Sequence, residues 1–412
     1  MGSAVLDDAR AISGEVAALR HAIHAEPEIG LELPATQAKV LAALDGLPLE
    51  IIRGRGLSSV TAVLRGARPG PAVLLRGDMD ALPVAERTGL PFASRVPGVM
   101  HACGHDLHTA MLAGAARLLA ARRADLPGSV IFMFQPGEEG DGGARLMISE
   151  GVLDAAGERP VAAYGLHVTS GDLPLGVASS RPGPMMAAAD TLHVTIRGRG
   201  GHGSQPHRAA DPIPVACEIV LALQSMVTRR FDVFDPVVVT VGTFHAGTTD
   251  NVIPEDAAFV ATVRTFSEAA RGRMRDAAPR LARQVAAAHG LSAGVDYVDG
   301  YPVTVNTEAE VGFAAEVIGD VLGADRFVAA PNPLPGSEDF SYVLDLVPGA
   351  FIMLGACPEG TDPRQAAFNH SPDAIFDDAV LAEGTALYAE LALRRLAAAA
   401  GQPAGEPAAG AA

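Results

Sequence analysis

Short, almost continuous apolar runs alternate with helical patterns over the first 185 residues of the chain. Apolar runs of this length that end near Gly or Pro are typical of strands buried on both faces of a sheet. A helical pattern over residues 108–128 lies between two of these runs. Strands that alternate with helices in this way predict an α/β fold with a mainly parallel sheet covered by helices. The strand-like runs are residues 58–66, 71–80, 129–140 and 159–168.

The pattern changes near residue 186, where polar and apolar positions begin to alternate as they do in half-buried strands. Strands and helical segments then follow in the order β-α-β-β-α-β, which predicts a ferredoxin-like α+β domain. Beyond residue 300 the first pattern returns, and the chain ends in an Ala/Gly/Pro-rich stretch that predicts a disordered tail. We therefore expect a discontinuous α/β domain, residues 1–185 and 301–396, an inserted domain, residues 186–300, and a tail, residues 397–412.

Composition narrows the range of partners and locations. With 49% hydrophobic and 19% charged residues, the 412-residue chain is long enough for two or three domains with hydrophobic cores. The formal net charge of −17 argues against nucleic acids and anionic membranes as partners. No apolar run approaches the roughly 18 residues of a membrane span, and the N-terminal segment lacks the features of a secretory signal. Three widely spaced cysteines imply no disulfide framework, so we expect a cytoplasmic protein.

Three of the strand-like runs end in charged or metal-ligating side chains. In α/β sheets, ligands bind beyond the carboxyl ends of the strands. The sequence therefore predicts that these side chains meet at one edge of one sheet. They are Asp78 and Asp80, Glu138 and Glu139, and His167.

The segment MHACGHDLHTA, residues 100–110, lies between two of these runs. Residues two apart on an extended segment point to the same side, so Cys103 and His105 can reach one ion. A thiolate with an imidazole suits zinc or another borderline divalent metal. Two other interpretations stay open: a buried cysteine beside a hydrogen-bonded histidine, or a cysteine nucleophile activated by His105. The nucleophile interpretation leaves the two glutamates without a role.

Adjacent side chains on extended backbone diverge, so we expect Glu138 and Glu139 to have different tasks, one as a metal ligand and the other as general base. A pair of acids on a loop is more often simply solvated, and a lone histidine such as His167 is more often a core residue. Taken together, however, five residues have the types and number that hold two divalent ions, which activate a water and polarise a carbonyl. These residues are Cys103, His105, Glu139, His167 and His370.

Eight short motifs follow one another along the chain: DMDALP, MHACGHDLHTA, QPGEEG, GLHV, GGHGSQPH, DNVIP, GSEDFSY and NHSPD. Their order resembles that of the M20 metallopeptidase family, and in particular its amidohydrolase branch of hippurate hydrolases, N-acyl-amino-acid amidohydrolases and auxin-conjugate hydrolases. Each motif is modest, but the ordered set is specific and spans about residues 78–373.

The resemblance implies a role for each matched residue. Glu138 matches the catalytic base, which takes a proton from the metal-held water and passes it to the leaving nitrogen. The inserted domain matches a lid and dimerisation domain, in which His202 stabilises the oxyanion and Asn251 contacts the substrate. Divalent ions, two per subunit and either Zn²⁺, Mn²⁺ or Co²⁺, are implied as cofactors. The matched metal ligands are Cys103, His105, Glu139, His167 and His370.

Two positions depart from the wider family but agree with the amidohydrolase branch. The run Asp78-Met79-Asp80 stands where most relatives carry His-x-Asp, and Cys103 stands where many carry a bridging aspartate. Asp78 is therefore a candidate for an additional ligand. Asp80 is a candidate for an outer partner that orients a histidine.

The resemblance implies a metal-dependent amidohydrolase that cleaves the amide bond of N-acyl amino acids, such as N-acetyl or N-benzoyl conjugates, and forms a homodimer through the inserted domain. Arg208 and Arg264 are candidates for pairing with a substrate carboxylate, although most arginines are solvated surface charges. Three alternatives stay open: a dipeptidase or carboxypeptidase with the same site, an amidase with Cys103 as nucleophile, and a catalytically silent metal-binding protein. Glu138 argues against the last, because metal binding alone does not require a second carboxylate.

Overall fold

The computed structural model describes residues 3–401, and the chain forms two compact units. We call the larger one the α/β unit and the smaller one the α+β unit, and we describe each by itself. The domain boundaries expected from the sequence stay a prediction. Within the described residues, the α/β unit comprises 3–183, 305–331 and 342–401, and the α+β unit comprises 184–304 and 332–341.

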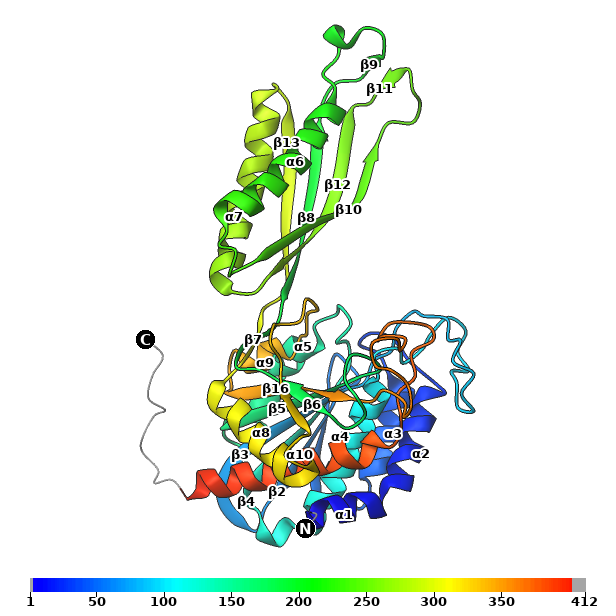
Figure 1. The fold of residues 1–412 in the computed structure, drawn as a ribbon, viewed down its shortest axis with the longest axis vertical. Helices are drawn as coiled ribbons and strands as arrows, with labels where there is room; N and C mark the ends of the chain where they lie inside the picture. The colour runs from blue at the N-terminus through cyan, green and yellow to red at the C-terminus, as the bar shows by residue number, and fades with distance from the viewer. Residues whose placement is uncertain (1–2, 402–412) are drawn as a thin grey trace. The chain divides into compact units, whose positions relative to one another are not determined.

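An eight-stranded sheet lies at the centre of the α/β unit (Figure 1). Its strands in chain order are β1 (Leu49–Arg53), β2 (Val60–Arg65), β3 (Arg68–Asp78), β4 (Pro127–Gln135), β5 (Ala162–Thr169), β6 (Ala178–Ser180), β15 (Phe327–Ala329) and β16 (Gly349–Gly355). Their order in the sheet is β1-β2-β4-β3-β5-β16-β6-β15. Strands β4, β3, β5 and β16 run parallel, as do β6 and β15.

The sheet is mixed: four of the seven neighbouring strand pairs in the described sheet are parallel, so the expectation of a mainly parallel sheet holds by a narrow margin. The β1–β2, β2–β4 and β16–β6 pairs are antiparallel. At the β1 edge, the reason is the short connection between the strands, since β1 ends at Arg53 and β2 begins at Val60. A connection this short joins neighbouring strands only as an antiparallel hairpin.

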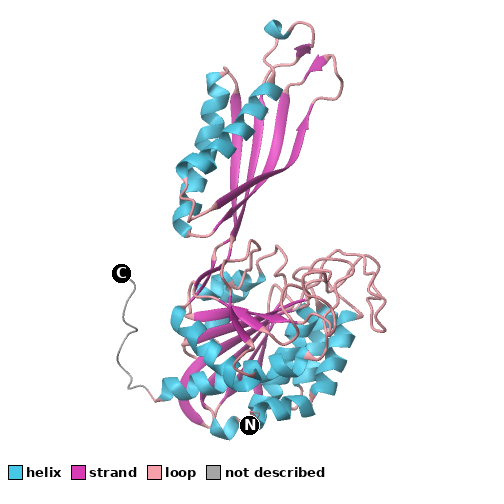
Figure 2. Cartoon of the chain, in the orientation of Figure 1, coloured by secondary structure: helices cyan, strands magenta, loops and turns pink. Residues whose placement is uncertain are grey.

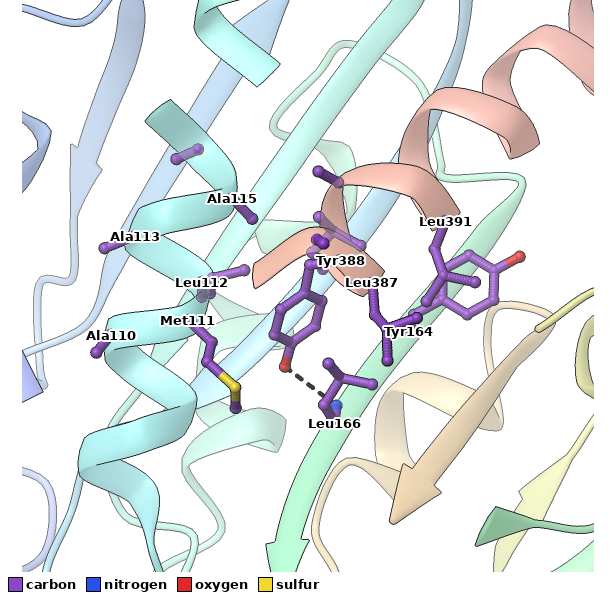
Figure 3. Packing of buried hydrophobic residues seen from close by; sticks show 14 of the residues in the cluster. Ala110, Met111, Leu112, Ala113, Ala115, Tyr164, Leu166, Leu387, Tyr388 and Leu391 are labelled. Atoms are coloured by element: carbon purple, nitrogen blue, oxygen red, sulfur yellow. Dashed lines mark hydrogen bonds between the residues drawn. The ribbon is translucent and has the colours of Figure 1, made fainter. Parts of the chain in front are cut away.

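Helices cover this sheet, and two of them contribute many of the buried core residues. Helix α4 (His105–Ala121) is buried on nearly all sides and packs against α10 (Val380–Ala400), while both contact β3. Tyr388 of α10 reaches β5, where its hydroxyl accepts a hydrogen bond from the backbone N–H of Leu166 over 3.0 Å (Figure 3). The remaining helices of this unit are α1 (Ala4–Ala11), α2 (Ser13–His24), α3 (Pro34–Leu44), α5 (Gly143–Ser149), α8 (Glu308–Leu322) and, at its boundary, α9 (Ser341–Leu344).

The end of α10 corrects one expectation from the sequence. Residues 397–400, which were expected to begin the disordered tail, are the last residues of this helix. The rest of the expected tail, from residue 402, lies outside the described residues. No helix within residues 3–401 is long and apolar enough to cross a membrane.

The α+β unit contains a four-stranded antiparallel sheet with two helices on one side (Figure 2). The chain order is β8 (Ala188–Arg197), α6 (Pro212–Arg230), β10 (Val237–Ala246), β12 (Asp256–Thr265), α7 (Glu268–Ala288) and β13 (Ser292–Tyr301), which is the expected β-α-β-β-α-β order. In β12, every second residue is buried against the helices, as in a sheet covered on one face. Segment 332–341 joins this unit through Ala187, whose backbone N–H donates to the carbonyls of Leu334 and Gly336.

Two small sheets complete the strands. One pairs β9 (Gly201–His202) with β11 (Val252–Ile253), and the other pairs β7 (Gly183–Met186) with β14 (Thr304–Asn306).

Candidate metal centre

Cys103 lies on a tight loop close to the end of β5, and this loop leads into α4, whose first residue is His105. Between Cys103 and His105, Gly104 adopts a left-handed backbone with a φ of 84°. A Cβ atom at this position would lie 2.4 Å from Cγ2 of Val168, so only glycine allows the loop to approach β5 this closely. As a result, the Cys103 Sγ lies 3.4 Å from Nε2 of His167.

Two of the candidate histidines turn the same ring nitrogen toward a common point. Nδ1 of His105 donates to the Asp80 carbonyl over 2.8 Å, and Nδ1 of His167 donates to the Val168 carbonyl over 2.9 Å, with tautomers assigned from these partners. Nε2 of each ring is therefore left with a lone pair. Nε2 of His105 is buried without a hydrogen-bond partner among the described residues. Metal-binding histidines are typically held in this way.

A second group of ligands shares Cys103 with the first. Ligand atoms of Cys103, Glu139 and His370 lie within 4.8 Å of one another, and so do those of Cys103, His105 and His167. Nε2 of His370 is 3.1 Å from Oε1 of Glu139. Two ligands bound to one ion at about 2.0–2.3 Å with tetrahedral geometry lie about 3.5 Å apart, so both groups fit a divalent ion and Cys103 is placed to bridge two.

The pKa shifts of two of the five residues, His167 and His370, suit a metal centre. Burial lowers the pKa of the His167 ring well below its usual range, which keeps it neutral, as a metal ligand must be. Cys103 and Glu139 raise the pKa of His370 to about 10, more than its burial lowers it. The site at His370 is thus one in which a positive charge is stabilised, and a divalent ion supplies that charge in place of a proton.

Asp80 connects the glutamate loop to His105. Its carboxylate accepts hydrogen bonds from the backbone N–H groups of Glu138 and Glu139, over 2.9 and 3.0 Å, and its carbonyl accepts from His105. Asp80 thus has the contacts of a residue that orients ligands. Its carboxylate holds the glutamate loop, and its main-chain carbonyl, not its side chain, orients His105. Glu139 meets His370, whereas the carboxylate of Glu138 is buried within 4.8 Å of the ligand atoms of His105 and Glu139.

Asp78 has the contacts of a positioning residue, since both of its oxygens are engaged. Oδ1 accepts from Nδ1 of His108 over 2.6 Å, and Oδ2 accepts from Nη1 of Arg76 over 2.7 Å. Nε2 of His108 accepts from the backbone N–H of Val168, so this histidine has no nitrogen left for an ion. No role was predicted for His108. Its position, about one helical turn after His105 in α4, places both side chains on the same face of the helix and could have indicated one.

The candidate residues of the α+β unit fall into two places. His202 in β9 is exposed, and Nδ1 of its ring accepts from the hydroxyl of Ser204 over 3.0 Å. Asn251 is close to it, because the neighbouring Val252 pairs with His202 across the β9–β11 sheet. Exposed Arg208 follows on the same loop.

Arg264 lies apart from these residues, on an inner strand of the four-stranded sheet. It sits near the end of β12 and pairs in register with Ala189 of β8 and Val238 of β10. Its Nη1 is buried without a hydrogen-bond partner among the described residues, and this burial lowers the pKa of the guanidinium. The structure therefore does not bring the two candidate arginines together within this unit.

These groups form a candidate metal centre with an adjacent buried carboxylate, an arrangement that suits a metal-dependent hydrolase. Residues 74–394 match peptidase family M20/M25/M40, and the chain belongs to this family, in its amidohydrolase branch. It is a metal-dependent hydrolase of the amidohydrolase type, which acts on carbon–nitrogen bonds of linear amides.

Several relatives span nearly the whole chain. The chain is 37% identical to Thermostable carboxypeptidase 1 of Saccharolobus solfataricus, over 94% of this chain and 97% of the relative. It is 34% identical to Hippurate hydrolase of Campylobacter jejuni, over 93% and 97%. It is also similar to a crystal structure described as a dinuclear metal binding peptidase from M20 family, from Bacillus subtilis, with a TM-score of 0.81, 34% identity and coverage of 94% and 99%.

Proposed function

We propose that this protein hydrolyses the amide bond of N-acyl amino acids with two divalent ions, Zn²⁺, Mn²⁺ or Co²⁺, which would be held by Cys103, His105, Glu139, His167 and His370. The observation that carries the proposal is the pair of three-residue ligand groups joined at one sulfur, with the carboxylate of Glu138 beside them. Bound ions would lower the pKa of a water and polarise the substrate carbonyl. A relative named Hippurate hydrolase, 34% identical over nearly its full length, supports an N-acyl amino acid as substrate.

Each proposed step uses a named group of this chain. Glu138 takes the proton of the attacking water and delivers it to the nitrogen of the leaving amino acid, while its loop is held by Asp80. His202 donates to the oxyanion that forms from the carbonyl oxygen. Asn251 contacts the substrate, and Arg208 or Arg264 pairs with its carboxylate.

Glu138 and Glu139 offer a matched pair of variants to test the proposal. Glu138→Gln should retain both ions and lose about 10²–10⁴-fold in kcat on N-acetyl and N-benzoyl amino acids, because a general base contributes about that much. Glu139→Gln should instead lose metal. Elemental analysis and steady-state kinetics measure both. Normal turnover by Glu138→Gln, or metal loss from that variant alone, would show that the wrong glutamate has been assigned to the base.

A dipeptidase or carboxypeptidase is the second candidate, because the relative named Thermostable carboxypeptidase 1 is 37% identical over 94% of this chain. A panel of N-acyl amino acids and dipeptides, assayed with each metal, separates the two activities by their kcat/KM. A Cys103-nucleophile amidase would be inhibited by alkylation and not by chelators. The sharing of Cys103 between both ligand groups argues against it.

We also propose a homodimer formed through the α+β unit, and a cytoplasmic location. Strand β10 is an edge of the four-stranded sheet, and its exposed apolar residues Val238 and Phe244 support a protein contact there. Leu221 of α6 is also exposed. Analytical ultracentrifugation of the full chain tests the dimer, and cell fractionation tests the location.

A further inference from the structure

Asn369 makes hydrogen bonds to two other segments that carry candidate metal ligands. Its Nδ2 lies 3.0 Å from the Val168 carbonyl, 3.2 Å from the Cys103 carbonyl and 3.8 Å from the Cys103 sulfur. Its Oδ1 accepts from the backbone N–H and hydroxyl of Ser170, over 3.0 and 3.1 Å. Since Asn369 directly precedes His370, one side chain joins the loop before α4, the end of β5 and the loop of His370.

The two ligand groups differ in how firmly their histidines are held. His105 opens α4 and His167 lies within β5, and both are buried, with Nδ1 fixed by a carbonyl. The His370 side chain is 54% exposed and projects from a loop. Its backbone is left-handed, with a φ of 71°, which is unfavourable for a residue other than glycine. The surrounding contacts must therefore keep His370 in place.

Few of the other described contacts of this loop are buried. The backbone N–H of His370 donates to the Ala102 carbonyl over 2.8 Å. Arg87 pairs with Asp373 across the outside of the loop, but both side chains are largely exposed, and exposed ion pairs contribute little. The hydrogen bonds of Asn369, by contrast, are made to two backbone carbonyls at the bases of other ligands. The loop keeps its hydrogen bonds at Ala367 and Pro372, so a mutation that removes those of Asn369 loosens the segment around His370 without releasing the whole loop.

We propose that Asn369 is a positioning residue that holds His370 against Cys103 and so sets the affinity of one ion, the one bound by Cys103, Glu139 and His370. It acts through these ligands and not on the substrate. The ion bound by Cys103, His105 and His167 depends on it much less, because both of those histidines are fixed by regular secondary structure. The inference rests on the metal centre of the proposed function.

Titration of the metal-free full-length protein with Co²⁺ tests this inference. Binding is followed by calorimetry and by the absorption of cobalt bound to thiolate, with no activity assay involved. Wild type should bind two ions. In Asn369→Ala, one ion should bind within about threefold of its wild-type affinity and the other about 10–100-fold more weakly, the range typical of lost partners of metal ligands. The matched control is Arg87→Ala, which frees the exposed side of the same loop and should leave both affinities unchanged.

A second variant covers the case in which Asn369→Ala does not fold. Asn369→Leu has nearly the same size and adds no charge beside the ligands, but it lacks the N–H groups that reach the Cys103 and Val168 carbonyls. The same selective weakening is expected, with near-UV circular dichroism to show that the metal-free variant is folded. Unchanged affinities, or equal weakening of both ions, in a folded variant would overturn the inference. Wild-type protein that binds no divalent ion would overturn the proposed function instead.

Discussion

The two units of this protein treat polar side chains in opposite ways. The α/β unit buries charged residues around the candidate centre, including Arg76, Asp78 and Glu138, whereas the core of the α+β unit is apolar apart from a few groups such as Asp190 and its partner Arg271. Buried charges are costly unless they are paired, so the α/β unit spends stability on fixed geometry. The α/β unit therefore holds its candidate metal ligands in fixed positions, whereas the α+β unit presents exposed residues such as His202.

The buried charges of the α/β unit extend beyond the ligands. Arg20 of α2 donates to Asp106 over 3.0 Å and to the Phe376 carbonyl over 3.0 Å, and His24 contacts Asp106 over 2.9 Å. Asp106 directly follows His105 in α4. Helix α2 thus links the start of α4 to the segment after His370. Helix α2 itself lies outside residues 74–394, the range that matches the family.

The largest effect is expected from Cys103→Ala, because this sulfur belongs to both ligand groups. The variant should lose both ions on dialysis and all measurable activity, and elemental analysis with a kinetic assay checks this. Cys357→Ala is the control: Cys357 is also buried, but its sulfur approaches only the carbonyls of Pro358 and Thr361 among its described hydrogen-bond partners. If Cys103→Ala retained two ions, Cys103 would not be a ligand common to both groups, and the contrast between the units would lose its main support.

An intermediate effect is expected from His202→Ala in the α+β unit. Loss of one oxyanion donor lowers kcat by about 10²–10³-fold, and metal content should stay at the wild-type level. His207→Ala changes another exposed histidine of the same loop and should leave kcat unchanged. If His202→Ala lost metal, or kept its full kcat, the proposed division of tasks between the units would be wrong.

The smallest effect concerns stability and pH. Burial lowers the pKa of His24, but Asp106 and Glu86 outweigh it and raise the pKa to about 9. The protonated ring therefore stabilises the folded chain below about pH 6.5, and this contribution is lost as the pH rises through about 9. It amounts to up to about 3 kcal/mol of the free energy of unfolding.

Denaturant unfolding at pH 6 and pH 9.5 measures this contribution. The decrease in stability over this range should be smaller in His24→Gln than in wild type. His289→Gln, an exposed histidine paired with Glu218, should behave as wild type. If wild type and His24→Gln showed the same pH dependence, protonated His24 would not make this contribution to stability.

Strand ends identify only part of the candidate site from the sequence. Asp80 and Glu139 follow β3 and β4, and His167 lies near the end of β5; these neighbouring strands run parallel and therefore share one edge. Cys103, His105 and His370 lie outside the strands and were found from their residue types and the order of the motifs. His108 and Asn369 could not be assigned in this way. Their partners, such as Val168, are 60 and 201 residues away in the sequence, and no local pattern encodes which hydrogen bonds will form.

The mixed character of the sheet was missed for a related reason. Residues 58–66 were correctly read as a strand, but the direction in which that strand pairs depends on its neighbour β1, whose exposed pattern over Leu49–Arg53 gives little sign of a strand. Edge strands face water and lack the apolar run that identifies central ones.

Asp80 couples the positions of two groups of the candidate centre. Its carbonyl anchors one imidazole, and its carboxylate anchors the loop that ends in the proposed proton acceptor. A displacement of Asp80 therefore shifts both groups together, so the distance between the imidazole and the acceptor changes less than it would with separate anchors. A distance that is wrong by about an ångström would cost a large share of the rate.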